Sequence, residues 1–238
     1  MGWRKLVLIW LCLIMTSLPA WAGQNLLIKG REAQKAGRHE QAVKLLQQYL
    51  QQYPQMAEAR APLAEALASL GRKPEALQVL DKGLVQQPEN LKLLLAKADL
   101  LMGMDRRSEA IKVLNRANKC NPRNAEVLKL RSDCRAEEGC FPEALADLNR
   151  AAQLTPKDPW VYNKRGLVWF CQGQYKKAVA DFSTAIRLAP DSPHAYFFRG
   201  NMYRYHLGQI DKAIADYKKG CSLGHSLCCH ELELLGVK

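Results

Sequence analysis

Proline recurs at one fixed interval along this chain. Five prolines follow one another at intervals of 34 residues, namely Pro54, Pro88, Pro122, Pro156 and Pro190. An alanine stands twelve residues before each of them, at Ala42, Ala76, Ala110, Ala144 and Ala178. A period of 34 residues with helical patterning inside each unit is typical of a stacked array of helix-turn-helix repeats. The spacing therefore predicts an all-α protein.

The repeated positions have physical reasons. Small residues such as Ala178 allow two antiparallel helices to approach closely, and glycines such as Gly71 stand where the first helix of a unit should end. Each proline ends the second helix, because the residue before a proline is disfavoured in helical geometry. Apolar residues spaced like Val179, Phe182 and Ile186 give each helix one apolar stripe. One helix pair cannot bury its stripe alone, so neighbouring pairs must stack.

These patterns resemble the tetratricopeptide repeat (TPR) family over nearly all of the chain after residue 22. The fifth unit matches the family pattern best, with Gly166, Trp169, Ala178, Phe182 and Pro190. The resemblance implies an α-solenoid of about six TPR helix-turn-helix repeats in a right-handed superhelix, followed by a short C-terminal capping helix, so about thirteen helices in all. The repeats would span 23–56, 57–90, 91–124, 125–158, 159–192 and 193–226, with the capping helix in 227–238.

Two repeats depart from the family pattern. In the sixth, Ala213 lies one residue late, which predicts a one-residue insertion near His206–Leu207. In the fourth, Arg135 stands where the family has an apolar residue, which leaves the packing of that position open.

The first 22 residues have a different character. Arg4 and Lys5 precede an apolar run from Leu6 to Met15, and the residues Ala20–Ala22 give the small-x-small pattern of a cleavage site. This pattern predicts a secretory signal peptide over 1–22 and a periplasmic or secreted protein with no stable membrane insertion after cleavage. An uncleaved membrane anchor is the alternative, although the apolar run is short for a span of about 20 residues.

Charge and motifs narrow the classes of function. The formal net charge is +12, but the basic residues are scattered and are not interleaved with aromatic residues. We therefore expect no nucleic-acid binding, and either a solvated basic face or a preference for acidic partners. The sequence contains no Gly-rich phosphate loop, His-Glu-x-x-His or Gly-x-Ser-x-Gly motif, so it predicts neither an enzyme nor a cofactor.

Seven cysteines follow residue 22, and the C-terminal ones are clustered. Their surroundings resemble cysteine-rich relatives of TPR repeats, which implies a disulfide from Cys221 to Cys228 or Cys229, with Cys229 favoured. Reduced core cysteines are one alternative, and a metal site of His225, Cys228, Cys229 and His230 is another. The sequence gives no pairing for the other four, Cys120, Cys134, Cys140 and Cys171.

The TPR resemblance also implies which positions face the concave groove. In the first four repeats these positions hold small or charged residues, including Glu65, Lys92 and Asp133. In the fifth and sixth they are rich in aromatic residues, amides and arginine, the types that contribute most to binding or pair with a peptide backbone. The predicted peptide-binding set is Trp160, Asn163, Phe170, His194, Phe197, Asn201, Arg204 and Tyr205. Alternatively, several of these aromatic residues are core.

The sequence thus predicts an exported TPR scaffold or adaptor that binds protein or peptide segments in its groove, for the assembly of an envelope or secretion complex. A TPR module that self-associates into a homo-oligomer is one alternative. A metal-binding or redox-active protein that uses the C-terminal cysteines is another.

Overall fold

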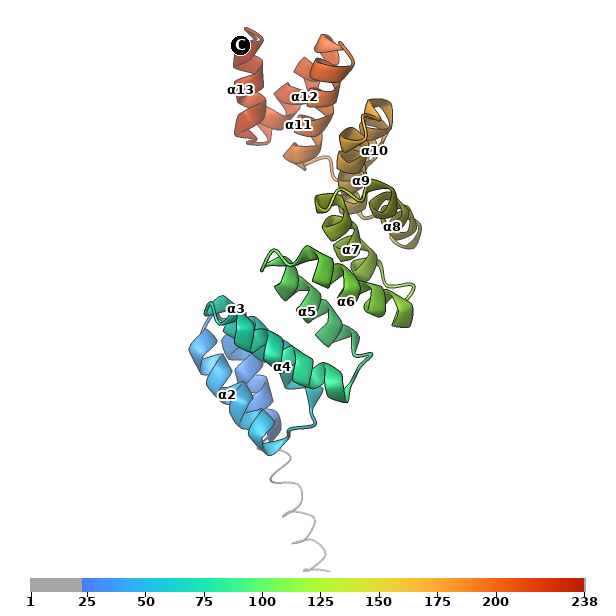
Figure 1. Ribbon diagram of the computed structural model, residues 1–238. Helices are drawn as coiled ribbons and strands as arrows, with labels where there is room; N and C mark the ends of the chain where they lie inside the picture. Colours follow the sequence, from blue (N-terminus) through green and yellow to red (C-terminus); the bar gives the residue numbers. More distant parts are fainter. Residues whose placement is uncertain (1–22, 238) are drawn as a thin grey trace, which may run out of the picture. The chain divides into compact units, whose positions relative to one another are not determined.

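The computed structural model describes residues 23–237, and the predicted signal peptide therefore lies outside the described residues. Within them every regular element is helical, in consecutive packed pairs, and no strand occurs (Figure 1). The predicted all-α solenoid is confirmed, and so is the number of thirteen helices for the described part of the chain. None of the described helices is long and apolar enough to cross a membrane.

The chain divides into two compact units. The described part of the N-terminal unit, 23–120, contains a helix over 23–35 followed by α2 (His39–Gln52), η1 (Ala57–Ala59), α3 (Arg60–Ser69), α4 (Lys73–Gln86), α5 (Leu91–Met102) and α6 (Arg107–Cys120). The C-terminal unit contains α7 (Ala125–Glu137), α8 (Phe141–Leu154), α9 (Pro159–Cys171), α10 (Tyr175–Leu188), α11 (Pro193–Asn201), η2 (Met202–His206), α12 (Ile210–Ser222) and α13 (Ser226–Leu234). Each predicted repeat contains one helix pair.

A residue with positive φ ends the first helix of each pair. Gly71 has φ 77°, and the N–H of the next residue, Arg72, donates to the carbonyl of Leu67 at 2.9 Å. This five-residue closure is the Schellman arrangement, and glycine suits it because it has no Cβ. In the third repeat the same position is Asp105, with φ 62°. Aspartate is among the few other residues that tolerate this conformation.

The extra residue of the sixth repeat is absorbed in η2, which is a turn of π-helix. In the fifth repeat the N–H of Gln174 donates to the carbonyl of Trp169, five residues back, at 2.9 Å. In the sixth, Gln209 donates to Tyr203, six residues back, at 2.9 Å. A π-helical turn is a common way to fit one additional residue into a helix. The insertion predicted near His206–Leu207 therefore leaves α12 in register with the other second helices.

Ion pairs to buried aspartates join the two helices of each repeat in the C-terminal unit. The pairs are Arg131–Asp147, Arg165–Asp181 and Arg199–Asp216, each closed by two hydrogen bonds of 2.7–2.9 Å. The three aspartates are 4–6% exposed. Such bidentate pairs fix the orientation of one helix against the other.

Arg135, whose packing the sequence leaves open, pairs with one of these buried aspartates. Its Nη1 donates to Oδ2 of Asp147 at 2.7 Å. The position that is apolar in the family pattern is thus occupied by a second arginine on the buried aspartate.

Candidate functional site

The predicted peptide-binding residues of the fifth repeat are only partly accessible. Trp160 packs against the core between α8 and α9, and the Nζ atoms of Lys129 and Lys164 lie 4.8 and 5.2 Å from its ring centroid. The Oδ1 atom of Asn163 is buried and accepts no hydrogen bond from the described residues. Trp160 thus serves the core at least in part, which is the alternative that the sequence left open.

Phe170 is the most exposed predicted residue of the fifth repeat, at 37%. Its ring lies 5.5 Å from that of His206, which stacks at 4.0 Å on Tyr175. The three rings form a small aromatic group that joins the ends of the first helices of repeats five and six. Neither Tyr175 nor His206 was in the predicted set.

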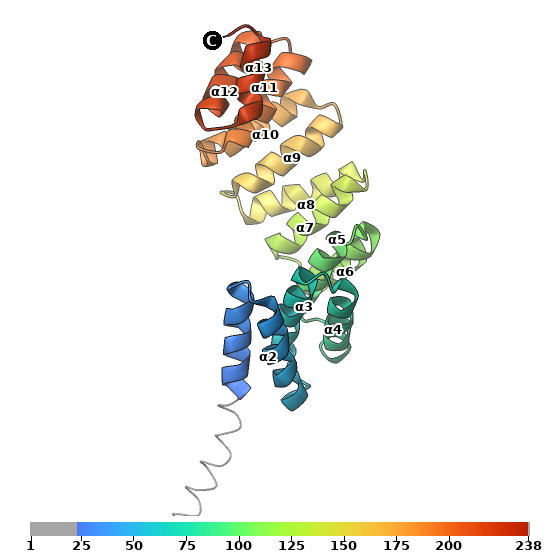
Figure 2. The same cartoon turned by 90° about the vertical axis from the view of Figure 1, so that its left-hand side faces the viewer.

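In the sixth repeat several of the predicted residues contact the C-terminal segment, because α13 packs on α12 (Figure 2). The ring of Phe197 stacks on that of His225 at 4.8 Å, and Nδ1 of His194 is 3.1 Å from Nε2 of His225. Burial, together with His194, lowers the pKa of His225. Part of the predicted binding surface is therefore covered by the residue that precedes α13.

Further along α13, Glu231 engages two more predicted residues. It forms an ion pair with Arg204 and accepts a hydrogen bond from Tyr205 at 2.8 Å. Asn201 accepts a hydrogen bond of 2.8 Å from the hydroxyl of the buried Tyr217. All three residues thus have partners within the chain, although Tyr205 remains 55% exposed. The proposed role of the set in peptide binding stays a prediction.

The C-terminal cysteines form one disulfide in the structure. Cys221, in the last turn of α12, is bonded to Cys229, in the first turn of α13. Cys228 is fully buried against Gly220, and burial raises the pKa of its thiol to about 11. Because the disulfide uses Cys229, the alternative metal site loses a ligand. Among the described residues no group of three or more His, Cys, Asp or Glu is arranged to hold a metal ion.

Alkylation should distinguish these thiols. In the native, unreduced protein we expect iodoacetamide to modify the exposed Cys140 and Cys171 and to leave Cys228 untouched, because the thiolate is the reactive form. Cys221 and Cys229 should react only after reduction. Peptide mapping by mass spectrometry measures this order. Rapid native labelling of Cys228 would contradict the described packing of α13.

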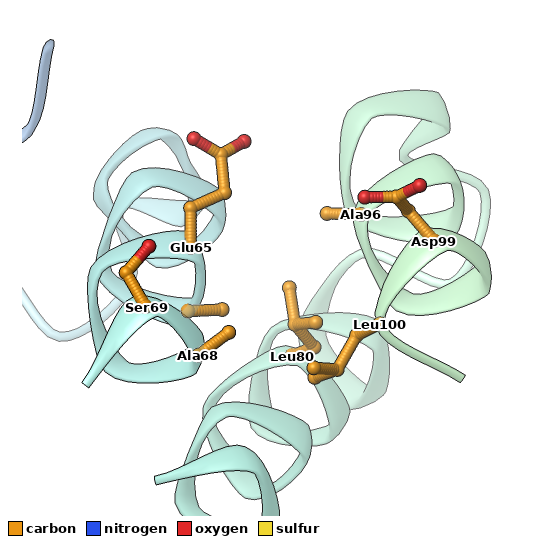
Figure 3. A pocket seen from close by; sticks show the side chains of 8 residues that line it. Glu65, Ala68, Ser69, Leu80, Ala96, Asp99 and Leu100 are labelled. Atoms are coloured by element: carbon orange, nitrogen blue, oxygen red, sulfur yellow. The ribbon is translucent and has the colours of Figure 1, made fainter. Parts of the chain in front are cut away.

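Two hollows of the N-terminal unit lie along α3. The larger one, of ≈ 610 Å³, is bounded by Arg31, the segment 56–61 and the start of α5 at Leu91 and Lys92. The smaller one, of ≈ 220 Å³, lies between α3, α4 and α5 (Figure 3). Both open beside groove positions that the TPR resemblance implies, and Glu65 and Lys92 are among their lining residues. The structure thus adds a candidate site to the predicted one.

Two carboxylates face each other across the smaller hollow. Figure 3 shows Glu65 on α3 and Asp99 on α5 above a floor that includes Ala68, Leu80 and Leu100. The amide of Gln34 donates to Oε2 of Glu65 at 2.9 Å. Burial, and to a smaller extent the charge of Asp99, raises the pKa of Glu65. Loss of solvent around the Glu65 carboxylate is the main cause, because it disfavours the charged form, and the like charge of Asp99 adds to it.

Comparisons with known proteins agree with this architecture. Models of the tetratricopeptide repeat match residues 33–89, 75–134, 134–201 and 193–223. The chain therefore belongs to the tetratricopeptide repeat family. A search of the curated proteins found no match.

Several solved structures share the fold. A structure from the functional characterisation of Pseudomonas aeruginosa PilF covers 90% of this chain and 98% of its own, at 18% identity and a TM-score of 0.75. MamA from Desulfovibrio magneticus RS-1 covers 71% and 96%, at 18% identity and a TM-score of 0.66. YrrB, described as a TPR protein with an unusual peptide-binding site, covers 79% and 97%, at 18% identity and a TM-score of 0.64. At these identities the likeness concerns the fold.

Proposed function

We propose that this chain is a non-enzymatic, exported adaptor that holds a segment of a partner protein against the first helices of its repeats, in the assembly of an envelope or secretion complex. The observation that carries the proposal is the pair of hollows along α3, of ≈ 610 and ≈ 220 Å³. They combine apolar floors with a few polar side chains, as binding sites commonly do. A peptide-binding site in YrrB, which has the same fold, supports the same use of this one.

Export rests on two supports. The pattern of residues 1–22 is that of a signal peptide with cleavage after Ala22. The disulfide between Cys221 and Cys229 fits an oxidising compartment, where such bonds persist. N-terminal sequencing of the purified native protein should therefore begin at Gly23. Full-length protein recovered from the cytoplasm would contradict the proposed localisation.

Site-specific photocross-linking tests the adaptor role. A photoreactive amino acid in place of Ala68, which lines the smaller hollow, should give a discrete cross-linked partner in native envelopes. The same residue in place of Lys82, exposed on α4, is the matched control and should give none. Mass spectrometry of the product identifies the partner. If both positions give the same products, or neither gives any, the proposed groove does not hold a partner.

A further inference from the structure

The two hollows along α3 differ in charge. The larger has charges of both signs at its rim, from Arg31, Glu58 and Lys92. In the smaller, the charged lining residues are both acidic, Glu65 and Asp99. A ligand that spans both hollows therefore meets charges of both signs in the larger hollow and only negative charges in the smaller one.

The acidic end lacks a cation from the chain itself. Acidic side chains of the C-terminal unit, by comparison, form ion pairs with lysines. The Nζ atom of Lys164 lies 2.9 Å from Oδ1 of Asp133, and that of Lys129 lies 3.2 Å from Oδ2 of Asp158. Within residues 23–237, by contrast, no lysine, arginine or histidine forms an ion pair with Glu65 or Asp99. The chain has 35 Lys and Arg against 23 Asp and Glu, so basic residues are not scarce. The lack of a basic partner is therefore a feature of this hollow and not of the composition of the chain.

The shape of the smaller hollow suits one long side chain. Its volume of ≈ 220 Å³ lies below the roughly 300–1,000 Å³ of ordinary small-molecule sites. Leu100 and the methyl groups of the partly exposed Ala68 and Ala96 can pack on an aliphatic stem, and the two carboxylates stand where its charged head would emerge (Figure 3). Lysine and arginine have this combination of stem and cation.

We propose that the smaller hollow receives a lysine or arginine side chain of an extended segment of the partner protein. The inference rests on the proposed function and names the chemistry of its ligand. Ala61, which lines the larger hollow, precedes Ala68, which lines the smaller one, by seven residues of α3, or about 10 Å of helix. About three residues of extended chain span that length. The segment thus carries its basic residue about three positions from an apolar one, which packs on Met56, Ala57 and Ala61.

The probe is a library of random twelve-residue peptides displayed on phage, selected on the mature protein. A protein of net positive charge attracts acidic peptides through its long-range field, so enrichment of basic ones is a discriminating result. We expect the enriched peptides to contain lysine or arginine about three residues from an apolar residue. Replacing that basic residue by norleucine, which keeps a stem without a charge, should weaken binding about tenfold or more.

Charge-removing variants locate the effect. Glu65→Gln with Asp99→Asn should weaken binding of the same peptides about tenfold or more, because charge-assisted hydrogen bonds are lost at little change in shape. Glu40→Gln, exposed on α2, is the control and should leave affinity unchanged. Circular dichroism shows whether each variant is folded.

The outcomes separate the two proposals. Enriched peptides without a basic residue, or equal affinity for the wild type and the Glu65/Asp99 variant, overturn this inference and leave the adaptor role standing. No enriched peptide together with no cross-link from position 68 overturns the adaptor role as well.

Discussion

Replacing Asp147 with alanine should lower the free energy of unfolding of the C-terminal unit by about 3–5 kcal/mol. Asp147 is 4% exposed and accepts hydrogen bonds from Arg131 at 2.9 and 2.7 Å and from Arg135 at 2.7 Å. Without it, the guanidinium groups of the buried Arg131 and the partly buried Arg135 lose the carboxylate that they share. The cost comes chiefly from those stranded charges, since a complete pair replaced by apolar residues can be neutral.

Urea unfolding followed by far-ultraviolet circular dichroism, with linear extrapolation, measures this loss. The matched control is Asp81→Ala, which removes the exposed partner of Lys97 at 2.5 Å. Exposed pairs contribute about 0–1 kcal/mol, so this variant should unfold nearly like the wild type. Equal losses in the two variants would show that the buried charges of repeat four are solvated, contrary to the structure.

Phe182→Ala should cost about 3–5 kcal/mol, the usual loss for a fully buried phenylalanine. Phe182 is 0% exposed, packs with Ala178 and Met202, and stacks on Phe198 with ring centroids 5.7 Å apart. The cavity left behind would sit between repeats five and six. Differential scanning calorimetry of the two proteins measures the difference.

The partner of Phe182 in this packing is Gly166, which provides a second test. A Cβ at residue 166 would lie 2.8 Å from Cε1 of Phe182, so Gly166→Ala should cost about 1–3 kcal/mol by overpacking. In the Phe182→Ala background the added methyl group meets empty space, and the two losses should not add. Additive losses would mean that residues 166 and 182 are not in contact, and that the helix pairing of repeat five is misassigned.

The helices of this protein could be predicted from the sequence because the signals lie close together along the chain. Each signal indicates one local feature of the backbone or of a helix face. Prolines such as Pro88 and Pro190 mark the end of a second helix, glycines such as Gly71 mark the end of a first helix, and the apolar stripes mark the buried faces. Where another residue meets the same requirement, the sequence is less informative, as at Asp105, whose left-handed conformation replaces that of glycine. Arg131, Arg165 and Arg199 recur at the same interval as the prolines, yet residue type alone does not indicate that each pairs with a buried aspartate.

The candidate site was harder to predict, since binding depends on which side chains already have partners. Asn201 and Arg204 have the chemistry of peptide-binding residues, yet Tyr217 and Glu231 engage them within the chain. In the sequence Glu65 is one of several charged residues at groove positions, and only the fold brings it opposite Asp99 over an apolar floor. Residue type at a groove position therefore does not reveal whether the position is available.

The buried pairs of the C-terminal unit bear on how a gene for such a chain can lengthen or shorten. Arg165 and Asp181 belong to the same repeat, so deletion of codons 159–192 removes both charges together. Arg165 also donates to Asn149 at 2.9 Å, and Arg199 donates to Ser183 at 2.9 Å, each sixteen residues back. After the deletion Arg199 would meet Asn149, the acceptor that Arg165 had used. Unequal recombination in steps of 34 codons can thus add or remove a repeat without separating the arginine and aspartate of such a pair.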